Sequence, residues 1–267
     1  MGNAYEERLG TDRMLPLIFK MSLPAVAAQL VNLLYNIVDR IYIGHIPGIG
    51  TDALAGIGVT SAVIILISSF SAIVGAGGSP LAAIALGQGN RERAGQILGN
   101  GFILLLIFTI LTSATTYLFM GPILLFTGAS ENTIGYATDY LSIYLLGTLF
   151  VELSVGLNTF INTQGRPTIA MYSVLIGAIL NIGLDPLFIF TFGMGVKGAA
   201  LATILSQACS AIWIISFLTS KKASLRLEYR YMKLHKGIIL SILALGVSPF
   251  IMASTESLVG FVLNSSL

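Results

Sequence analysis

Long apolar runs, joined by short polar connections, make up most of the chain. Runs of about 20 residues or more without strict alternation of apolar and polar positions are typical of helices that cross a membrane. An unpaired backbone group in lipid costs several kcal/mol, so spanning segments form helices or closed barrels. The pattern therefore predicts an all-α membrane protein, with spans near 15–43, 53–86, 97–120, 136–161, 168–191, 198–219 and 238–263.

The second run is longer than a bilayer requires and contains the stretch GAGGSP at 75–80. Proline removes a backbone donor, and glycine lets neighbouring helices approach closely. The stretch therefore predicts either a break in this helix or a close contact with another helix.

The composition agrees with a membrane protein and excludes other classes. Of 267 residues, 55% are hydrophobic and 10% are charged, whereas an average soluble domain carries roughly 25% charge. A soluble globular fold is therefore excluded. The net charge of +2 does not indicate a nucleic-acid partner, and the single cysteine, Cys209, can form no internal disulfide.

The positions of lysine and arginine give the orientation, because basic residues near span ends are retained on the cytoplasmic side. A cytoplasmic N-terminus leaves only Arg40 and Lys197 outside. The other 12 of the 14 basic residues are then cytoplasmic: Arg8, Arg13, Lys20, Arg91, Arg93, Arg166, Lys221, Lys222, Arg226, Arg230, Lys233 and Lys236. We therefore expect a multi-pass protein of the cytoplasmic membrane.

The segment 220–237 divides the chain into unequal parts. It carries six basic residues and one acid, which predicts a basic cytoplasmic linker, with a lipid-binding surface as the alternative. Residues 1–219 hold six spans and 238–267 hold one. Pro24 and Pro249, 225 positions apart, both open a span close after a serine. Because transporters often contain internal repeats, we expect a six-helix bundle, the first helix of an incomplete second bundle, and a longer parent chain.

Two acids occur at similar depth in the predicted membrane. Asp39 lies near the end of the first span and Asp185 near the end of the fifth, and both spans run from inside to outside. A charged side chain at membrane depth costs from about 2.5 kcal/mol upward, so each acid needs water or a partner. If the two helices are neighbours, the acids can share a proton or hold a cation.

Amide side chains accompany both acids at helical spacing. Asn32 and Asn36 are predicted to share a helix face with the first acid, and Asn181 precedes Asp185 by one turn. Pro186 has no N–H and its ring crowds the carbonyl one turn back, which leaves backbone oxygen free for a hard cation such as Na⁺. The alternative is a proline kink that an Asn/Asp hydrogen bond holds for packing alone.

Four stretches together resemble the multidrug and toxic compound extrusion (MATE) transporters: PAVAAQLVNLLYNIVDRIYIG at 24–44, GQGNRERAG at 87–95, QGRP at 164–167, and the segment from NIGLDP at 181–186 to GVKGAA at 195–200. The resemblance covers nearly the whole chain. It implies a fold of twelve helices in two lobes, in which inward movement of Na⁺ or H⁺ drives the export of organic cations. This chain then corresponds to the N-terminal lobe and part of the seventh helix, and the missing C-terminal lobe of the same chain is its expected partner.

The resemblance also implies roles for individual residues. Proton or cation binding is implied for Asp39, Asp185, Asn181, Thr203 and Tyr140. If the coupling ion is Na⁺, the first four of these would be its ligands, and no other cofactor is expected. Pro24 matches a proline at which the first helix bends, and Pro186 is a second candidate hinge.

Four further polar residues are candidate cation or drug sites: Glu256, Glu152, Asn158 and Asn36. Glu256 resembles an acid that binds cations in some members, with a buried, hydrogen-bonded glutamate as the alternative. Asn158 matches a polar residue of the fourth helix but lies near its inner end. Glu152, in mid-span, has no counterpart in the family pattern, and we interpret it either as an attractant for cationic drugs or as a proton-bearing structural acid.

Aromatic side chains in the spans have two interpretations. Cation-binding π-faces along a cavity are one role, and packing is the more frequent one. The candidates are Tyr35, Tyr140, Tyr144, Phe150 and Phe160.

The sequence GMGVKG at 193–198 fits the GxGxxG spacing. A dinucleotide fingerprint also needs a βαβ unit and an acid about 20 residues on, whereas these glycines join two apolar runs and the next acid is Glu228. We expect a tight turn and a close helix approach there. The sequence contains no Walker, HExxH or GxSxG motif, so we do not expect an enzyme.

The leading hypothesis is a secondary active antiporter for multidrug efflux, with organic cations or other drugs as substrates. The alternatives are a lipid-linked saccharide flippase of the same general architecture and a non-transporting membrane binding protein. A flippase would be expected to carry basic residues in its central cavity, whereas only Arg40 lies near a span interior.

Overall fold

The computed structural model describes residues 14–266; residues 1–13, which include Arg8 and Arg13, and Leu267 lie outside the described residues. The helices are α2 (Met14–Gly44), α3 (Gly50–Gly87), α4 (Arg91–Leu118), α5 (Met120–Phe126), α6 (Ile134–Thr163), α7 (Pro167–Pro186), α8 (Val196–Thr219) and α9 (Lys236–Ser266). A π-helical turn, η1 (Leu187–Thr191), follows α7, and a 3₁₀ turn, η2 (Tyr229–Tyr231), precedes α9. No strand occurs within 14–266, which agrees with the all-α prediction.

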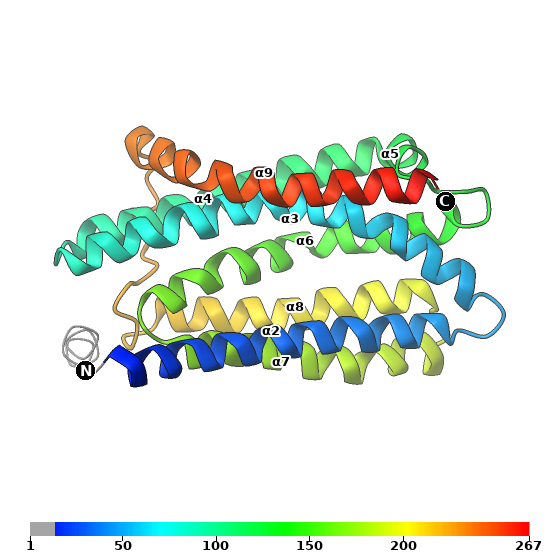
Figure 1. The fold of residues 1–267 in the computed structure, drawn as a ribbon, viewed down its shortest axis with the longest axis horizontal. Coiled ribbons are helices and arrows are strands. Elements are labelled where there is room, and N and C mark those ends of the chain that lie inside the picture. The colour runs from blue at the N-terminus through cyan, green and yellow to red at the C-terminus, as the bar shows by residue number, and fades with distance from the viewer. Residues whose placement is uncertain (1–13, 267) are drawn as a thin grey trace.

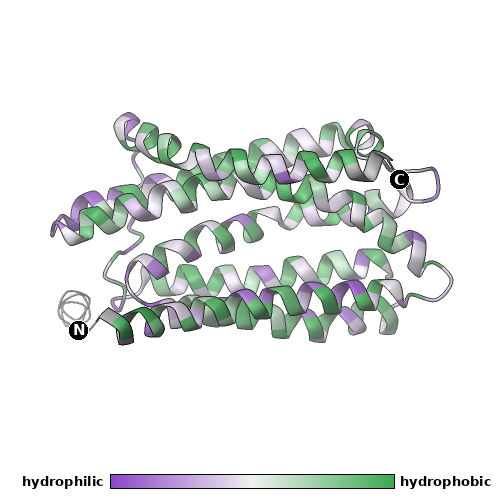
Figure 2. Ribbon diagram, in the orientation of Figure 1, coloured by the Kyte–Doolittle hydropathy of each residue, from purple (hydrophilic) through white to green (hydrophobic). Residues whose placement is uncertain are grey.

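Seven helices in the described range are long and apolar enough to cross a membrane: Ile18–Gly44, Gly50–Gly87, Arg91–Leu118, Ile134–Thr163, Pro167–Thr191, Val196–Thr219 and Lys236–Val262. Each overlaps one predicted span, so the span prediction is confirmed and the chain is a multi-pass membrane protein. Figure 2 shows hydrophobic residues along most of the length of these helices. The short helix α5 was not predicted, because the apolar run continues across the end of α4.

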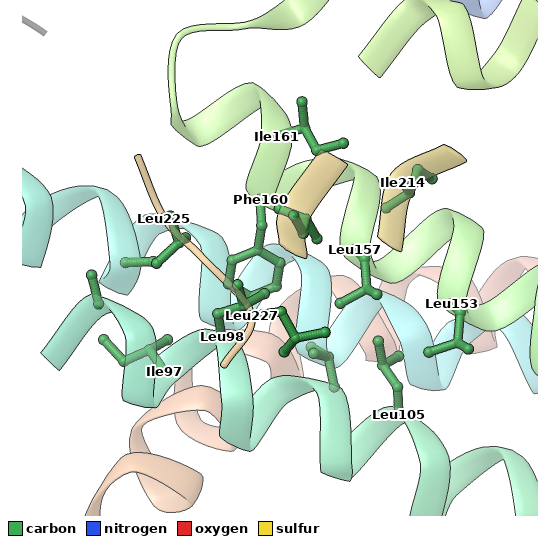
Figure 3. Packing of buried hydrophobic residues seen from close by; sticks show 14 of the residues in the cluster. Ile97, Leu98, Leu105, Leu153, Leu157, Phe160, Ile161, Ile214, Leu225 and Leu227 are labelled. Carbon is green, nitrogen blue, oxygen red and sulfur yellow. The ribbon is translucent and has the colours of Figure 1, made fainter. Parts of the chain in front are cut away.

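Helix α6 lies between two groups of helices (Figure 1). It packs against α3 and α4 in one group and against α8 and α7 in the other. Helix α2 packs mainly against α7, and α9 packs along α3. The largest hydrophobic cluster includes Phe160 and Leu157 of α6 and Leu105 of α4, which are almost completely buried (Figure 3). The bundle is therefore built around α6, the helix that contacts both groups.

Helix α3 is continuous through residues 75–80, where Gly75 and Gly78 make close contacts with α6. A Cβ atom at Gly78 would lie 2.8 Å from Cζ of Phe160, and one at Gly75 would lie 3.3 Å from the side chain of Thr159. Small residues let helix backbones approach in this way. Of the two expectations for this stretch, close helix contact is correct and a break is wrong.

The turn between η1 and α8 uses the glycines of the GxGxxG spacing. Gly193 and Gly195 have φ angles of +64° and +57°, in the left-handed region that glycine adopts without strain. A Cβ atom at Gly198 would lie 2.7 Å from the carbonyl carbon of Phe188. The glycines therefore serve a tight turn and a close approach, as predicted.

The segment 220–237, called the strap below, is packed against the bundle. Leu225 and Leu227 belong to the largest hydrophobic cluster and are 2% and 8% exposed (Figure 3). The backbone N–H of Leu225 donates to Oε1 of Gln164 at 3.0 Å, at the end of α6. The prediction of a plain linker is therefore incomplete, because the strap closes one end of the hydrophobic core.

Asn100 of α4 holds the strap through two hydrogen bonds. Its Nδ2 donates to the carbonyl oxygen of Lys233 at 3.0 Å, and its Oδ1 accepts from the N–H of His235 at 2.7 Å. Loss of a buried partner costs about 1–3 kcal/mol, so we expect trypsin to cleave the strap of Asn100→Ala roughly fivefold faster or more. Asn132→Ala, in an exposed loop at the other end of the bundle, is the control. Equal cleavage rates in both variants would show that Asn100 does not hold the strap.

Candidate functional site

Asp39 and Asp185 lie near the same end of two neighbouring helices. Asp39 is five residues before the end of α2, Asp185 is the penultimate residue of α7, and the two helices pack side by side (Figure 1). Asp185 is fully buried and Asp39 is partly buried. The two carboxyl groups lie within hydrogen-bonding range of each other. Ionised carboxylates offer only acceptors, so such a contact is favourable when a shared proton or a cation lies between them.

Three further side chains complete the cluster around the acid pair. Nδ2 of Asn181 lies 3.3 Å from Oδ1 of Asp185 and 3.4 Å from Oγ1 of Thr203 on α8. Tyr140, on α6, is buried close to Thr203 and Asp39. The structure thus brings together, from α2, α6, α7 and α8, the five residues for which the sequence implied ion binding.

Three acceptor oxygens of this cluster are buried without a hydrogen-bond donor: Oδ1 of Asp39, Oδ2 of Asp185 and Oδ1 of Asn181. Buried polar atoms in proteins are almost always paired, so each such atom needs an explanation. Carboxylate, amide and hydroxyl oxygens are the ligands that hard cations prefer. A proton on one carboxyl group would equally provide the missing donor. The donor set therefore fits either H⁺ or Na⁺.

Three of the predicted residues do not join this cluster. Asn36 is exposed, and its Nδ2 donates to a backbone carbonyl one turn earlier on α2. Asn158 lies towards the other end of α6, where its Nδ2 donates to the carbonyl oxygen of Ala170 at 3.1 Å and to Oγ of Ser173 at 2.6 Å. Glu256 is exposed on α9, which packs on α3. The structure does not support cation binding by these three with the acid pair, and the buried alternative for Glu256 is wrong.

Glu152 lies in a separate buried position between α6 and α3. Its side chain is 2% exposed and accepts hydrogen bonds from the hydroxyls of Ser68, at 3.0 Å, and Ser71. A carboxyl group enclosed in this way presents no surface to a drug molecule. The structure therefore does not support the interpretation of Glu152 as a drug attractant and leaves the proton-bearing alternative.

Tyr35 and Gln207 belong to the site, although the sequence interpretation did not include them in it. Tyr35 lies close to Gln207 on α8 and to Asp39 and Asp185. The signal in the sequence was the position of Tyr35 one turn before Asp39. Asn36 lies on nearly the same face of the helix, and the pattern of polar residues therefore indicates Asn36 and gives no sign of Tyr35.

A cavity of about 500 Å³ is lined by Tyr35 and Gln207, whereas neither acid of the pair lines it. It lies among α2, α6, α7 and α8, and Tyr35 and Gln207 belong both to its lining and to the surroundings of the acids. Other lining side chains are amides, such as Asn32 and Asn158, together with apolar residues such as Met171. Cavities of this size and mixed character bind small organic molecules. The structure therefore contains an ion-sized site and a ligand-sized cavity, with Tyr35 and Gln207 common to the surroundings of both.

The aromatic candidates occupy different environments. Tyr35 lines the cavity, whereas Tyr140 and Tyr144 stack on each other with ring centroids 6.1 Å apart. Phe160 is completely buried in the hydrophobic core, and Phe150 is 38% exposed. Packing is therefore the role of most of these side chains.

The two candidate hinges occupy different positions in their helices. Pro24 lies inside α2, which is continuous from Met14 to Gly44. Pro186 ends α7 and is followed directly by the π-helical turn η1. Proline removes one backbone hydrogen bond from a helix, so both positions are weak points in the backbone, and bending at them remains a prediction.

These features define a class: a multi-pass helical membrane protein with a buried acid pair and a cavity of ligand size. The family is given by a sequence comparison. The chain belongs to the MatE family, whose sequence model matches residues 24–187. The resemblance to MATE transporters is therefore confirmed.

Known relatives of similar sequence and structure belong to the same family. Multidrug export protein MepA of Staphylococcus haemolyticus (strain JCSC1435) is 28% identical over 243 residues, which cover 91% of this chain and 53% of the relative. The inward-facing structure of a multidrug resistance MATE family transporter of the MOP superfamily matches with a TM-score of 0.82 and 27% identity, over 90% of this chain and 56% of that chain. The outward-facing structure of such a transporter matches with a TM-score of 0.82 and 27% identity, over 89% and 52%. The chain thus spans about half the length of the curated relatives.

Proposed function

We propose that the protein is a secondary active multidrug exporter, which couples the outward movement of organic cations to the inward movement of H⁺ or Na⁺. The observation that carries the proposal is the junction between the two sites. Three buried oxygens without donors belong to a cluster near Tyr35, and Tyr35 also lines a cavity of about 500 Å³. Antiport requires that two ligands influence each other's binding, and a shared side chain is a direct route for that influence.

The ion site would be built from the acid pair and its neighbours. Asp39 and Asp185 supply the negative charge that holds the coupling ion, and Asn181 fixes the orientation of the Asp185 carboxyl group through its hydrogen bond. Thr203 supplies a hydroxyl oxygen next to this amide. Binding of a positive ion would satisfy the unpaired oxygens, so occupied and empty sites would differ in how tightly α2 is held against α7 and α8.

The cavity would receive the drug. Its amides provide hydrogen bonds in several directions, and its small and apolar residues accept molecules of different shape. The ring of Tyr35 offers a π-face to a cation. No basic side chain occurs among the described residues that line it, which favours an organic cation over the anionic headgroup that a lipid-linked saccharide flippase would bind.

Transport requires that the binding sites open first to one side of the membrane and then to the other, so the protein needs a second conformation. The bundle matches an inward-facing and an outward-facing transporter equally well, with TM-scores of 0.82. This equality supports a bundle that moves as one body against a second lobe, which we take to be the partner that the parent chain supplies. Bending at Pro24 or Pro186 would then connect loading of the ion site to this movement.

The distribution of basic residues supports a cytoplasmic N-terminus in the cell membrane. In this orientation the ends of α2 and α7 that carry Asp39 and Asp185 face the outside. The coupling ion would enter its site from the extracellular half of the bilayer, and the drug would leave towards the same side.

Transport by the natural full-length protein in inverted membrane vesicles tests this proposal. The vesicles are given an acidic lumen or a Na⁺-rich lumen, and ethidium, a fluorescent organic cation, is added outside. We expect one of the two gradients to raise ethidium accumulation roughly fivefold or more, and an ionophore that dissipates that gradient to abolish the increase. Accumulation no greater than in vesicles without the protein, under both gradients, would reject the proposal.

A further inference from the structure

Glu152 connects α6 to α3, and the proposed function gives this residue no role. Its Oε1 accepts a hydrogen bond from Oγ of Ser68 at 3.0 Å, and its Oε2 is bonded to the hydroxyl of Ser71. Both serines lie on α3, and the carboxyl group is 2% exposed. A carboxylate this deep in a membrane helix is costly unless its charge is compensated.

Charge compensation by a basic side chain is absent around Glu152 in the described part of the chain. Neither α3, α4, α7 nor α8 contributes a charged group to its surroundings. The titratable neighbour is Tyr144, about two turns earlier on α6, whose hydroxyl lies within range of the same Ser68. The negative charge of an ionised Glu152 would therefore be met by the hydroxyls of Ser68 and Ser71 and the backbone of Ser71, and by no basic side chain of the described residues.

A proton on Glu152 would add one hydrogen-bond donor between α6 and α3. The hydroxyl of Ser71 has a single hydrogen, and two acceptors lie within its reach: Oε2 of Glu152 and the carbonyl oxygen of Ser68, at 3.1 Å. If Oε2 is protonated, it donates to Oγ of Ser71, and the hydrogen of Ser71 is free for the carbonyl. The hydroxyl of Ser68 donates to Oε1 in either state. If Glu152 is ionised, the single hydrogen of Ser71 serves Oε2 instead, and the contact between α6 and α3 has one donor fewer.

We propose that Glu152 is a second, exchangeable proton-binding site of the bundle, separate from the acid pair, and that its proton fastens α6 to α3. The proton binds at Oε2 and leaves to water without any other bond being formed or broken. Its position matters for the whole bundle, because α3 is also the helix along which α9 packs. The proposal does not depend on which ion the acid pair binds, or on whether that pair drives transport.

Infrared difference spectroscopy of the purified natural protein in lipid tests this proposal. Spectra recorded between acidic and alkaline buffer are expected to contain the C=O band of a protonated carboxyl group that disappears on alkalinisation. Glu152→Gln should lose this band. Ser68→Ala should keep it but move it to higher frequency, because the hydroxyl that donates to the carbonyl oxygen Oε1 is removed.

Ser69→Ala is the matched control, since Ser69 also lies on α3 and is more deeply buried than Ser68, but its hydroxyl donates to the carbonyl oxygen of Leu66 at 2.6 Å. This variant should leave the band in place, as should Asp39→Asn. Identical spectra of Glu152→Gln and the unmodified protein at every pH, or a band that Ser68→Ala does not move, would overturn the proposal. So would loss of the band in Asp39→Asn, which would assign the proton to the acid pair. Failure of ethidium transport with the Glu152 band present would overturn the proposed function alone.

Discussion

Asp185→Asn is expected to lower gradient-driven ethidium accumulation by the natural protein at least roughly tenfold, which corresponds to about 1.4 kcal/mol of lost coupling. The substitution keeps the size of the side chain and one oxygen, but it removes the negative charge from the completely buried position next to Asp39. A single remaining carboxylate cannot hold both the shared proton and the contact between α2 and α7. The same vesicle assay measures the effect, and Asp39→Asn should behave alike.

Asp139→Asn is the matched control for loss of an acid at the same end of the bundle. Asp139 lies on α6 one residue before Tyr140 and pairs with Lys197 at 3.3 Å, with both side chains about half exposed. Exposed ion pairs contribute little to stability, so accumulation should remain near that of the unmodified protein. Full accumulation in Asp185→Asn and Asp39→Asn, with the same dependence on the gradient, would remove the acid pair from the mechanism.

The spans, and the depth of the two acids in the membrane, could be predicted from the sequence because the thickness of the membrane sets the length of each spanning helix. A spanning helix must stay apolar for about 20 residues, so the run 168–191 lies within one residue of the candidate span Pro167–Thr191. Depth then follows from counting along helices of known direction, which placed Asp39 and Asp185 at the same level. Thr203 and Tyr140 could be added only through the family resemblance, because nothing in their own segments sets them apart.

Counting residues along a helix gives the depth of each side chain, but it does not give the rotation of the helix about its axis. Tyr35 and Asn36 are adjacent and point about 100° apart, and both lie near the direction of Asp39. Packing of α2 against α7 decides between them: Tyr35 turns towards the acids, and Asn36 is exposed. Polarity alone does not distinguish the two residues, since a tyrosine can serve as a hydroxyl as well as an apolar ring.

The strap could not be predicted for a related reason. Leu225 and Leu227 lie in a segment rich in basic residues. Such a segment, considered by itself, indicates a connection that is surrounded by water. Their burial depends on the core around Phe160 and Ile97, far away in sequence (Figure 3). Contacts of this kind are decided by tertiary structure, and no local pattern of the segment carries them.

Gly246→Val is expected to lower the melting temperature of the purified protein in detergent by roughly 5–10 °C, the shift that about 3 kcal/mol of overpacking produces. Helices α3 and α9 touch backbone to backbone here. A Cβ atom at Gly246 would lie 2.3 Å from the carbonyl oxygen of Ile73, and one at Gly77 would lie 2.2 Å from that of Ile242. Main-chain atoms cannot swing aside as a flexible side chain does, so the two helices must separate.

The second contact between α3 and α9 lies farther along, where Oγ of Ser257 donates to the carbonyl oxygen of Ala62 at 2.6 Å. It should hold the helices together while the glycine contact opens, so Gly246→Val should destabilise the bundle without unfolding it. Gly77→Val acts on the same contact, and the double variant should therefore cost less than the sum of the two single ones. Gly237→Val, at a position of α9 with open space around it, should leave the melting temperature unchanged. Strict additivity, or an equal loss in Gly237→Val, would mean that valine harms α9 by itself and that close approach to α3 is not the cause.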